Sequence, residues 1–173
     1  MTRTKPVVGV VLGSDSDWAV MKETVALLHR LKVPSEVRVI SAHRTPDEAA
    51  AFARGAERSG IRVIIAAAGG AAHLAGVLAS HVTLPVIGVP LEGFSCLGGL
   101  DALLSTVQMP AGVPVATVAI GKAGARNAAI LAAQILALSD AALAARLRSM
   151  RTEARNAIAS KDKAIRDEAA GGK

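Results

Sequence analysis

Short apolar runs recur along the chain at intervals of roughly thirty residues, with helix-like segments between them. The five runs cover residues 6–12, 36–40, 62–67, 85–89 and 114–119. Because the runs are continuous and rich in valine and isoleucine, they predict parallel strands buried on both faces of a sheet. The intervening segments predict helices over residues 16–31, 46–58, 72–80, 99–108 and 124–138.

This alternation predicts an α/β fold, a three-layer αβα sandwich built from right-handed βαβ units around a parallel sheet. A further helix is expected from Ser139 or Asp140 to about residue 160. Its apolar positions recur at steps of three and four residues: Leu143, Leu147, Met150, Ala154 and Ile158. This stripe packs either on its own domain or on a neighbouring subunit. We therefore expect one domain over residues 1–160, including the C-terminal helix, and a frayed tail over residues 161–173.

The net charge of +6 is unevenly distributed and argues against a nucleic-acid partner. Residues 146–173 hold eight Lys/Arg and four Asp/Glu, a mixture typical of a solvated helix face. Aromatic side chains for base stacking are nearly absent, since the chain has one tryptophan, two phenylalanines and no tyrosine. No apolar run is long enough for a membrane span, and nothing resembles a secretory signal, so we expect a cytoplasmic protein without a membrane partner.

The segment Ser41-Ala42-His43-Arg44-Thr45-Pro46 follows the second predicted strand and precedes a helix start. Thr45 is expected to be the N-cap, with Pro46 at the first helical position and Glu48 completing a capping box. His43 and Arg44 then lie at the carboxyl end of a strand, where open α/β sheets bind ligands. Histidine can move a proton near neutral pH, and arginine can hold a phosphate by a two-pronged hydrogen bond.

Two other strand ends carry complementary groups. The first leads into Gly13-Ser14-Asp15-Ser16-Asp17, whose amides and hydroxyls suit a phosphate and whose carboxylates suit ribose hydroxyls; the same residues can simply cap the helix. The third leads into Gly69 and Gly70, which allow close approach of backbone to a ligand, and then His73, a neutral hydrogen-bonding group or a structural histidine. Together these strand ends predict a site for a small phosphorylated sugar derivative and proton-transfer chemistry.

Other chemistries find little support. The four histidines lack metal-ligand spacing, so no metal is expected. Cys96 is the single cysteine, and no partner base for it is recognisable. It lies in the glycine-punctuated loop 91–99, a type of loop that can cover an active site.

Five segments of this sequence resemble the PurE family of purine biosynthesis: residues 13–18, 41–46, 68–74, 107–110 and 119–129. The resemblance runs in order over residues 6 to 140. The family comprises N5-carboxyaminoimidazole ribonucleotide mutases and a sister class of aminoimidazole ribonucleotide carboxylases. It implies a flavodoxin-like sandwich, a homo-oligomer (usually an octamer) and a small ribonucleotide substrate. The sequence His-Arg-Thr-Pro is that of the mutase class, which uses neither metal nor nucleotide cofactor, whereas carboxylases typically have lysine after the histidine.

The resemblance also implies a role for each candidate residue. Ser14 and Asp17 would contact the ribose phosphate, with Ser41 and Arg44 as further phosphate ligands. His43 would be the catalytic proton shuttle, and Gly69 and Gly70 would hold the carboxylate or carbon dioxide, beside His73. Three departures from the family pattern affect none of these groups: Ala67, Ala75 and one extra residue in loop 91–99. The alternatives are a carboxylase that uses carbon dioxide or bicarbonate and a non-catalytic nucleotide-binding relative; a DNA-binding role is remote.

Overall fold

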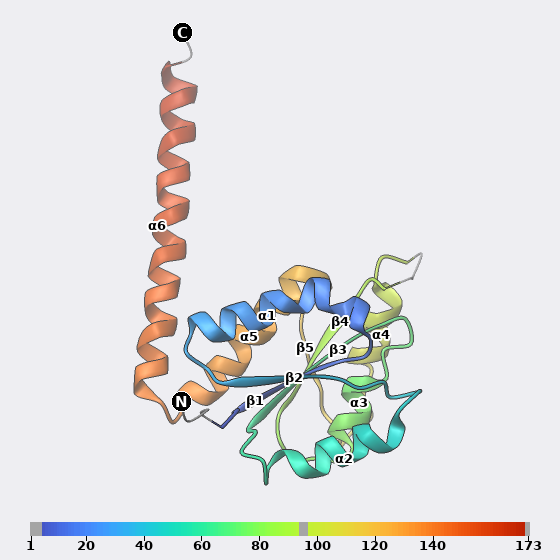
Figure 1. Ribbon diagram of the computed structural model, residues 1–173. Coiled ribbons are helices and arrows are strands. Elements are labelled where there is room, and N and C mark those ends of the chain that lie inside the picture. The colour runs from blue at the N-terminus through green and yellow to red at the C-terminus, as the bar shows by residue number, and fades with distance from the viewer. Residues whose placement is uncertain (1–4, 94–96, 172–173) are drawn as a thin grey trace.

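A five-stranded parallel sheet forms the centre of the molecule, as the apolar runs predict (Figure 1). The structure is a computed structural model and describes residues 5–93 and 97–171; Cys96 lies outside this range. The strands are β1 (Val8–Leu12), β2 (Ser35–Val39), β3 (Val63–Gly69), β4 (Val86–Leu91) and β5 (Ala116–Thr117), in the spatial order β2-β1-β3-β4-β5. This order changes direction between β1 and β3, so a ligand crevice is expected at their carboxyl ends.

Helices cover both faces of the sheet (Figure 1). They are α1 (Trp18–Arg30), α2 (Pro46–Ala56), α3 (Leu74–Ala79), α4 (Leu100–Val107), α5 (Gly121–Ala137) and α6 (Ala141–Gly171), with a short 3₁₀ helix, η1 (Asp15–Asp17), before α1. One apolar core joins the sheet to α1, α5 and the start of α6, and a second joins it to α2 and α3. The predicted three-layer αβα sandwich is therefore confirmed.

The strands of the sheet are buried in the way the continuous apolar runs predict, except at the edges. All residues of β1 and β4 are buried, because helices lie on both faces of these central strands. β2 and β5 are edge strands and are partly exposed. β5 has only two residues, both paired with β4, and is therefore shorter than the predicted run over residues 114–119.

The C-terminal helix α6 begins on the body and then extends away from it (Figure 1). Asp140 caps it, since the Leu143 amide donates to Asp140 Oδ1 at 2.9 Å. Leu143 and Leu147 are buried against the domain, so the first part of the apolar stripe packs on its own chain. From residue 151 onward every described residue is exposed, and the helix continues to Gly171 instead of ending near residue 160. Whether residues 161–173 fray stays a prediction.

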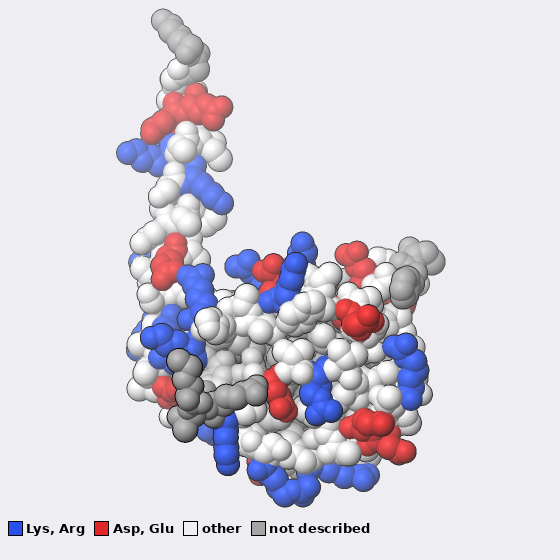
Figure 2. Space-filling model, in the orientation of Figure 1, with Lys and Arg blue, Asp and Glu red and all other residues white. Residues whose placement is uncertain are grey.

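Charged side chains of both signs are interspersed over the visible face and along α6 (Figure 2). Among the described residues, no helix combines the length and apolar character that crossing a bilayer requires.

Candidate active site

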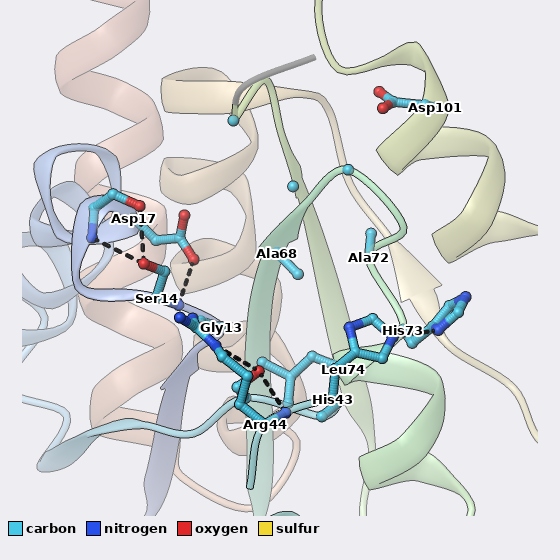
Figure 3. A pocket seen from close by; sticks show the side chains of 16 residues that line it. Gly13, Ser14, Asp17, His43, Arg44, Ala68, Ala72, His73, Leu74 and Asp101 are labelled. Carbon is cyan, nitrogen blue, oxygen red and sulfur yellow. Dashed lines mark hydrogen bonds between the residues drawn. The ribbon is translucent and has the colours of Figure 1, made fainter. Parts of the chain in front are cut away.

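A pocket of about 610 Å³ opens at the carboxyl edge of the sheet. Residues that follow β1, β2, β3 and β4 line it, because the carboxyl ends of parallel strands meet at one edge. All eight candidate residues from the sequence are among its walls: Ser14, Asp17, Ser41, His43, Arg44, Gly69, Gly70 and His73. Figure 3 shows several of these side chains around the pocket.

The turn after β1 is organised by a capping box, one of the two interpretations that its sequence allowed. Ser14 is the N-cap of η1; its hydroxyl oxygen accepts from the Ser16 amide at 3.4 Å, and Asp17 Oδ2 accepts from the Ser14 amide at 3.0 Å. The Ser14 hydroxyl also donates to Asp15 Oδ1 at 3.0 Å. Ser14 and Asp17 therefore cap the helix and also line the pocket, and the capping bonds fix their positions in its wall.

Asp17 is a buried carboxylate in the wall of a pocket that we expect to bind an anion. Burial raises the pKa of Asp17 above its ordinary value, because desolvation penalises the charged form. Hydrogen bonds from the backbone of Ser14 and Gly13 oppose this rise, and the nearby Asp15 carboxylate adds to it. The positive charge of Arg44 lowers the pKa by a smaller contribution. The carboxylate is thus held by local bonds at a cost in desolvation.

The loop after β2 is closed by side-chain hydrogen bonds within residues 41–45. The Thr45 hydroxyl accepts from the Ser41 amide at 3.0 Å and donates to the Ser41 carbonyl at 3.0 Å. Thr45 is the N-cap of α2 and Pro46 occupies the first turn, as predicted, but Thr45 makes no side-chain cap bond. The predicted capping box with Glu48 is therefore wrong, because the Thr45 hydroxyl is used to close the loop that carries His43.

Arg44 reaches from the end of β2 toward the end of β1 (Figure 3). Its backbone amide and its Nε both donate to Ser41 Oγ, at 3.2 and 3.4 Å, and its Nη2 donates to the Gly13 carbonyl at 3.3 Å. The side chain is exposed, so the remaining guanidinium N–H groups are open to a ligand in the pocket. A guanidinium held in this way suits a phosphate or carboxylate.

The loop after β3 approaches the β4–α4 loop closely at Gly69. A Cβ atom on Gly69 would lie 3.0 Å from the Cα of Gly93, so a larger residue does not fit without a backbone shift. Gly70 has φ +62°, and Ala72 has φ +47°, an uncommon conformation for a residue with a side chain. The Ser105 hydroxyl of α4 donates to the Ala71 carbonyl and ties this loop down.

His43 and His73 meet in the pocket. Nε2 of His43 lies 2.7 Å from Nδ1 of His73, and the two rings are in a T-shaped arrangement with centroids 4.8 Å apart and planes at 70°. The two residues come from the ends of β2 and β3, so this contact joins two separate loops. His73 is the N-cap of α3, one residue before the helical turn in which we expected it. Both side chains are exposed to the pocket.

Asp101 is a lining residue that the sequence patterns did not single out. It lies in the first turn of α4, and its Oδ1 atom is buried and has no hydrogen-bond partner among the described residues. The available signal was its place after Gly98 and Gly99 in the loop that follows β4, a strand end like the three that supply the predicted site residues.

A doubly wound α/β sheet with an arginine, a histidine pair and glycine-rich turns at its switch point has the geometry and chemistry that suit a small anionic ligand. Residues 7–157 match the family described as AIR carboxylase, and the chain belongs to that family. It is 54% identical over 154 residues to the N5-carboxyaminoimidazole ribonucleotide mutase of Bacillus subtilis (strain 168), covering 89% of this chain and 94% of that protein. It is 56% identical over 162 residues to the protein of the same name from Mycobacterium leprae (strain TN), covering 94% and 92%.

A solved structure agrees with the fold. The crystal structure of Treponema denticola PurE superposes with a TM-score of 0.75 at 26% sequence identity, covering 97% of this chain and 99% of that one. The resemblance seen in the sequence motifs is confirmed, and so is the flavodoxin-like sandwich.

Proposed function

We propose that this protein is an N5-carboxyaminoimidazole ribonucleotide mutase in which His43 shuttles the proton. The enzyme is an isomerase of purine (IMP) biosynthesis and converts its substrate to 4-carboxy-5-aminoimidazole ribonucleotide. Mutases more than half identical over most of the chain support this activity. The observation that carries the catalytic assignment is the placement of His43 and Arg44, an acid–base group and an anion-binding group, side by side along the chain in one pocket.

The phosphate and ribose are proposed to lie against the ends of β1 and β2. Arg44 offers guanidinium N–H groups that bond to no other residue in the described part of the chain, and the hydroxyls of Ser14 and Ser41 lie on the same wall. Asp17 is proposed to accept hydrogen bonds from ribose hydroxyls. A carboxylate repels the phosphate, whereas the hydroxyls of the sugar can donate to it. The other end of the substrate then reaches the ends of β3 and β4.

The carboxylate transfer is proposed to proceed by decarboxylation and recarboxylation. As the bond between the exocyclic nitrogen and the carboxylate carbon breaks, carbon dioxide is released and that nitrogen takes a proton from His43. The ring carbon then attacks the trapped carbon dioxide, a carbon–carbon bond forms, and the ring proton passes to His43. The histidine ends the cycle protonated, as it began, so no metal or other cofactor enters the balance.

Gly69 and Gly70 are proposed to hold the carboxylate or carbon dioxide through backbone amides, with His73 contacting the substrate nearby. Both glycines line the pocket where β3 passes into the loop that carries His73, and neither has a side chain to obstruct a ligand. Retaining carbon dioxide beside its acceptor converts the second step into one between neighbouring reactants. A positioned acid–base group contributes a further factor of about 100 to 10,000.

We also propose a cytoplasmic homo-oligomer, an octamer by family resemblance. Support comes from half-exposed apolar residues on one side of α4, namely Leu100, Leu104 and Val107. Light scattering on the purified protein measures the assembly, and a monomer would contradict this part of the proposal.

The reaction is tested with two substrates. Conversion of N5-carboxyaminoimidazole ribonucleotide without added bicarbonate is the expected result. If the protein instead converts only aminoimidazole ribonucleotide plus bicarbonate, it is a carboxylase and the mutase assignment fails. If it binds the nucleotide and turns over neither substrate, it is a non-catalytic relative.

A further inference from the structure

The contact between His43 and His73 constrains the protons of both rings. A separation of 2.7 Å between Nε2 of His43 and Nδ1 of His73 requires one N–H donor and one acceptor, so a single proton lies between the rings. If both nitrogens carried protons, the two N–H groups would face each other and repel. If neither did, two lone pairs would face each other. The contact therefore couples the tautomer of one ring to that of the other.

The two rings are carried by loops that are fixed independently of each other. The His43 loop is closed by the Thr45 and Ser41 hydrogen bonds, and the His73 loop is tied by the Ser105 hydroxyl. A bond between the Ala72 amide and the Gly69 carbonyl at 3.3 Å closes the second loop further. Each loop thus fixes the position of its own histidine, and the contact between the rings sets only their orientation and the place of the shared proton.

We propose that His73 is a positioning residue that holds the Nε2–H of His43 throughout the reaction and leaves Nδ1 of His43 to exchange the proton. The inference rests on the proposed mutase function for its catalytic meaning. Neutral His73 with its proton on Nε2 offers an Nδ1 lone pair. That lone pair accepts from His43 both when His43 is a neutral base and when it is an imidazolium. The same hydrogen bond serves both forms.

The proton balance fits this arrangement. His43 begins as the imidazolium, and its Nδ1 proton passes to the exocyclic nitrogen as carbon dioxide leaves. It is then neutral, with its remaining proton on Nε2 held by His73 and its lone pair on Nδ1. That lone pair takes the ring proton in the second step and restores the imidazolium. Without His73 the neutral ring of His43 can carry its proton on Nδ1. In that tautomer Nδ1 has no lone pair to take the ring proton of the substrate.

The first test measures tautomers and does not depend on turnover. In protein labelled with ¹⁵N-histidine, the nitrogen shifts of His43, assigned by their loss in His43→Asn, report which ring nitrogen carries the proton. We expect one neutral form with the proton on Nε2 in the parent and a mixture in His73→Leu. The matched control is His29→Leu, an exposed histidine in the last turn of α1 outside the pocket. A proton on Nδ1 in the parent, or no change in His73→Leu, would overturn the proposal.

The second test separates positioning from substrate contact. His73→Leu should lower kcat by about 10- to 150-fold, the range for a lost hydrogen bond to a charged group. Loss of the proposed substrate contact of His73 should change KM by less than about threefold. His73→Asn should recover part of kcat, because its amide oxygen lies near the position of Nδ1 and can accept. A rise in KM with kcat retained would show a substrate contact only and would overturn positioning. If the parent turns over no substrate, the proposed function fails while the tautomer measurement still decides the role of His73.

Discussion

Replacing Arg44 by alanine tests whether its guanidinium binds the phosphate of the substrate. The side chain is exposed, and its bonds within the protein are long, 3.4 Å to Ser41 Oγ and 3.3 Å to the Gly13 carbonyl. The free energy of unfolding should therefore change by no more than about 0.5 kcal/mol. A lost charge-assisted hydrogen bond to phosphate costs about 1.5–3 kcal/mol, which predicts nucleotide binding weaker by about 10- to 150-fold.

Calorimetric titration with aminoimidazole ribonucleotide and with the corresponding nucleoside gives the decisive comparison. The nucleoside lacks the phosphate, so its affinity should be the same for the parent and for Arg44→Ala. Arg58→Ala is the matched control, since Arg58 is exposed in the turn beyond the C-terminal end of α2 and lies outside the pocket. Equal losses for nucleotide and nucleoside, or an unchanged nucleotide affinity, would refute the assignment of Arg44 to the phosphate.

Three further substitutions probe the walls of the pocket. Burial raises the pKa of Asp17, so the folded protein binds this proton up to a higher pH than the unfolded chain, and stability from this group falls as pH rises above about 4. The melting temperature of Asp17→Asn minus that of the parent should therefore increase as the pH rises from about 4 to 7. A difference that does not change with pH would contradict the raised pKa of Asp17. Gly69→Ala should lose about 1–3 kcal/mol of stability in urea unfolding, because its Cβ would meet the Gly93 backbone. Gly70→Ala meets no atom of the described residues within 4 Å and should lose about 1–2 kcal/mol for its positive φ alone; a larger loss for Gly70→Ala than for Gly69→Ala would show that contact with Gly93 is not what limits Gly69.

Much of the site could be predicted from the sequence because its position follows from topology. Continuous apolar runs mark the buried strands, and the residues directly after them fall at one edge of a parallel sheet. Ser14, His43 and Gly69 could thus be grouped by their places after predicted strands, although they lie far apart in the chain. The order of the strands, which places β1 between β2 and β3, is not encoded in any local pattern.

The features that the sequence did not predict depend on choices between competing hydrogen bonds, on loop conformation and on helix packing. Thr45 has the residue type and position of a capping threonine, yet its hydroxyl bonds to Ser41, and no local rule ranks these two uses. The His43–His73 contact joins two separate loops, and in one of them Ala72 has a left-handed conformation that alanine does not favour. Asp101 enters the pocket through the packing of α4 on the sheet, and its neighbours in sequence give only the glycine signal.

The most direct test of the account is the turnover of N5-carboxyaminoimidazole ribonucleotide by His43→Asn, measured together with the affinity for aminoimidazole ribonucleotide. If His43 carries the proton, kcat should fall by about 100- to 10,000-fold, the range for a lost general acid–base group. The affinity should stay within about threefold of the parent, because the phosphate contacts at Arg44 remain. A His43→Asn variant with the turnover of the parent would contradict the central claim.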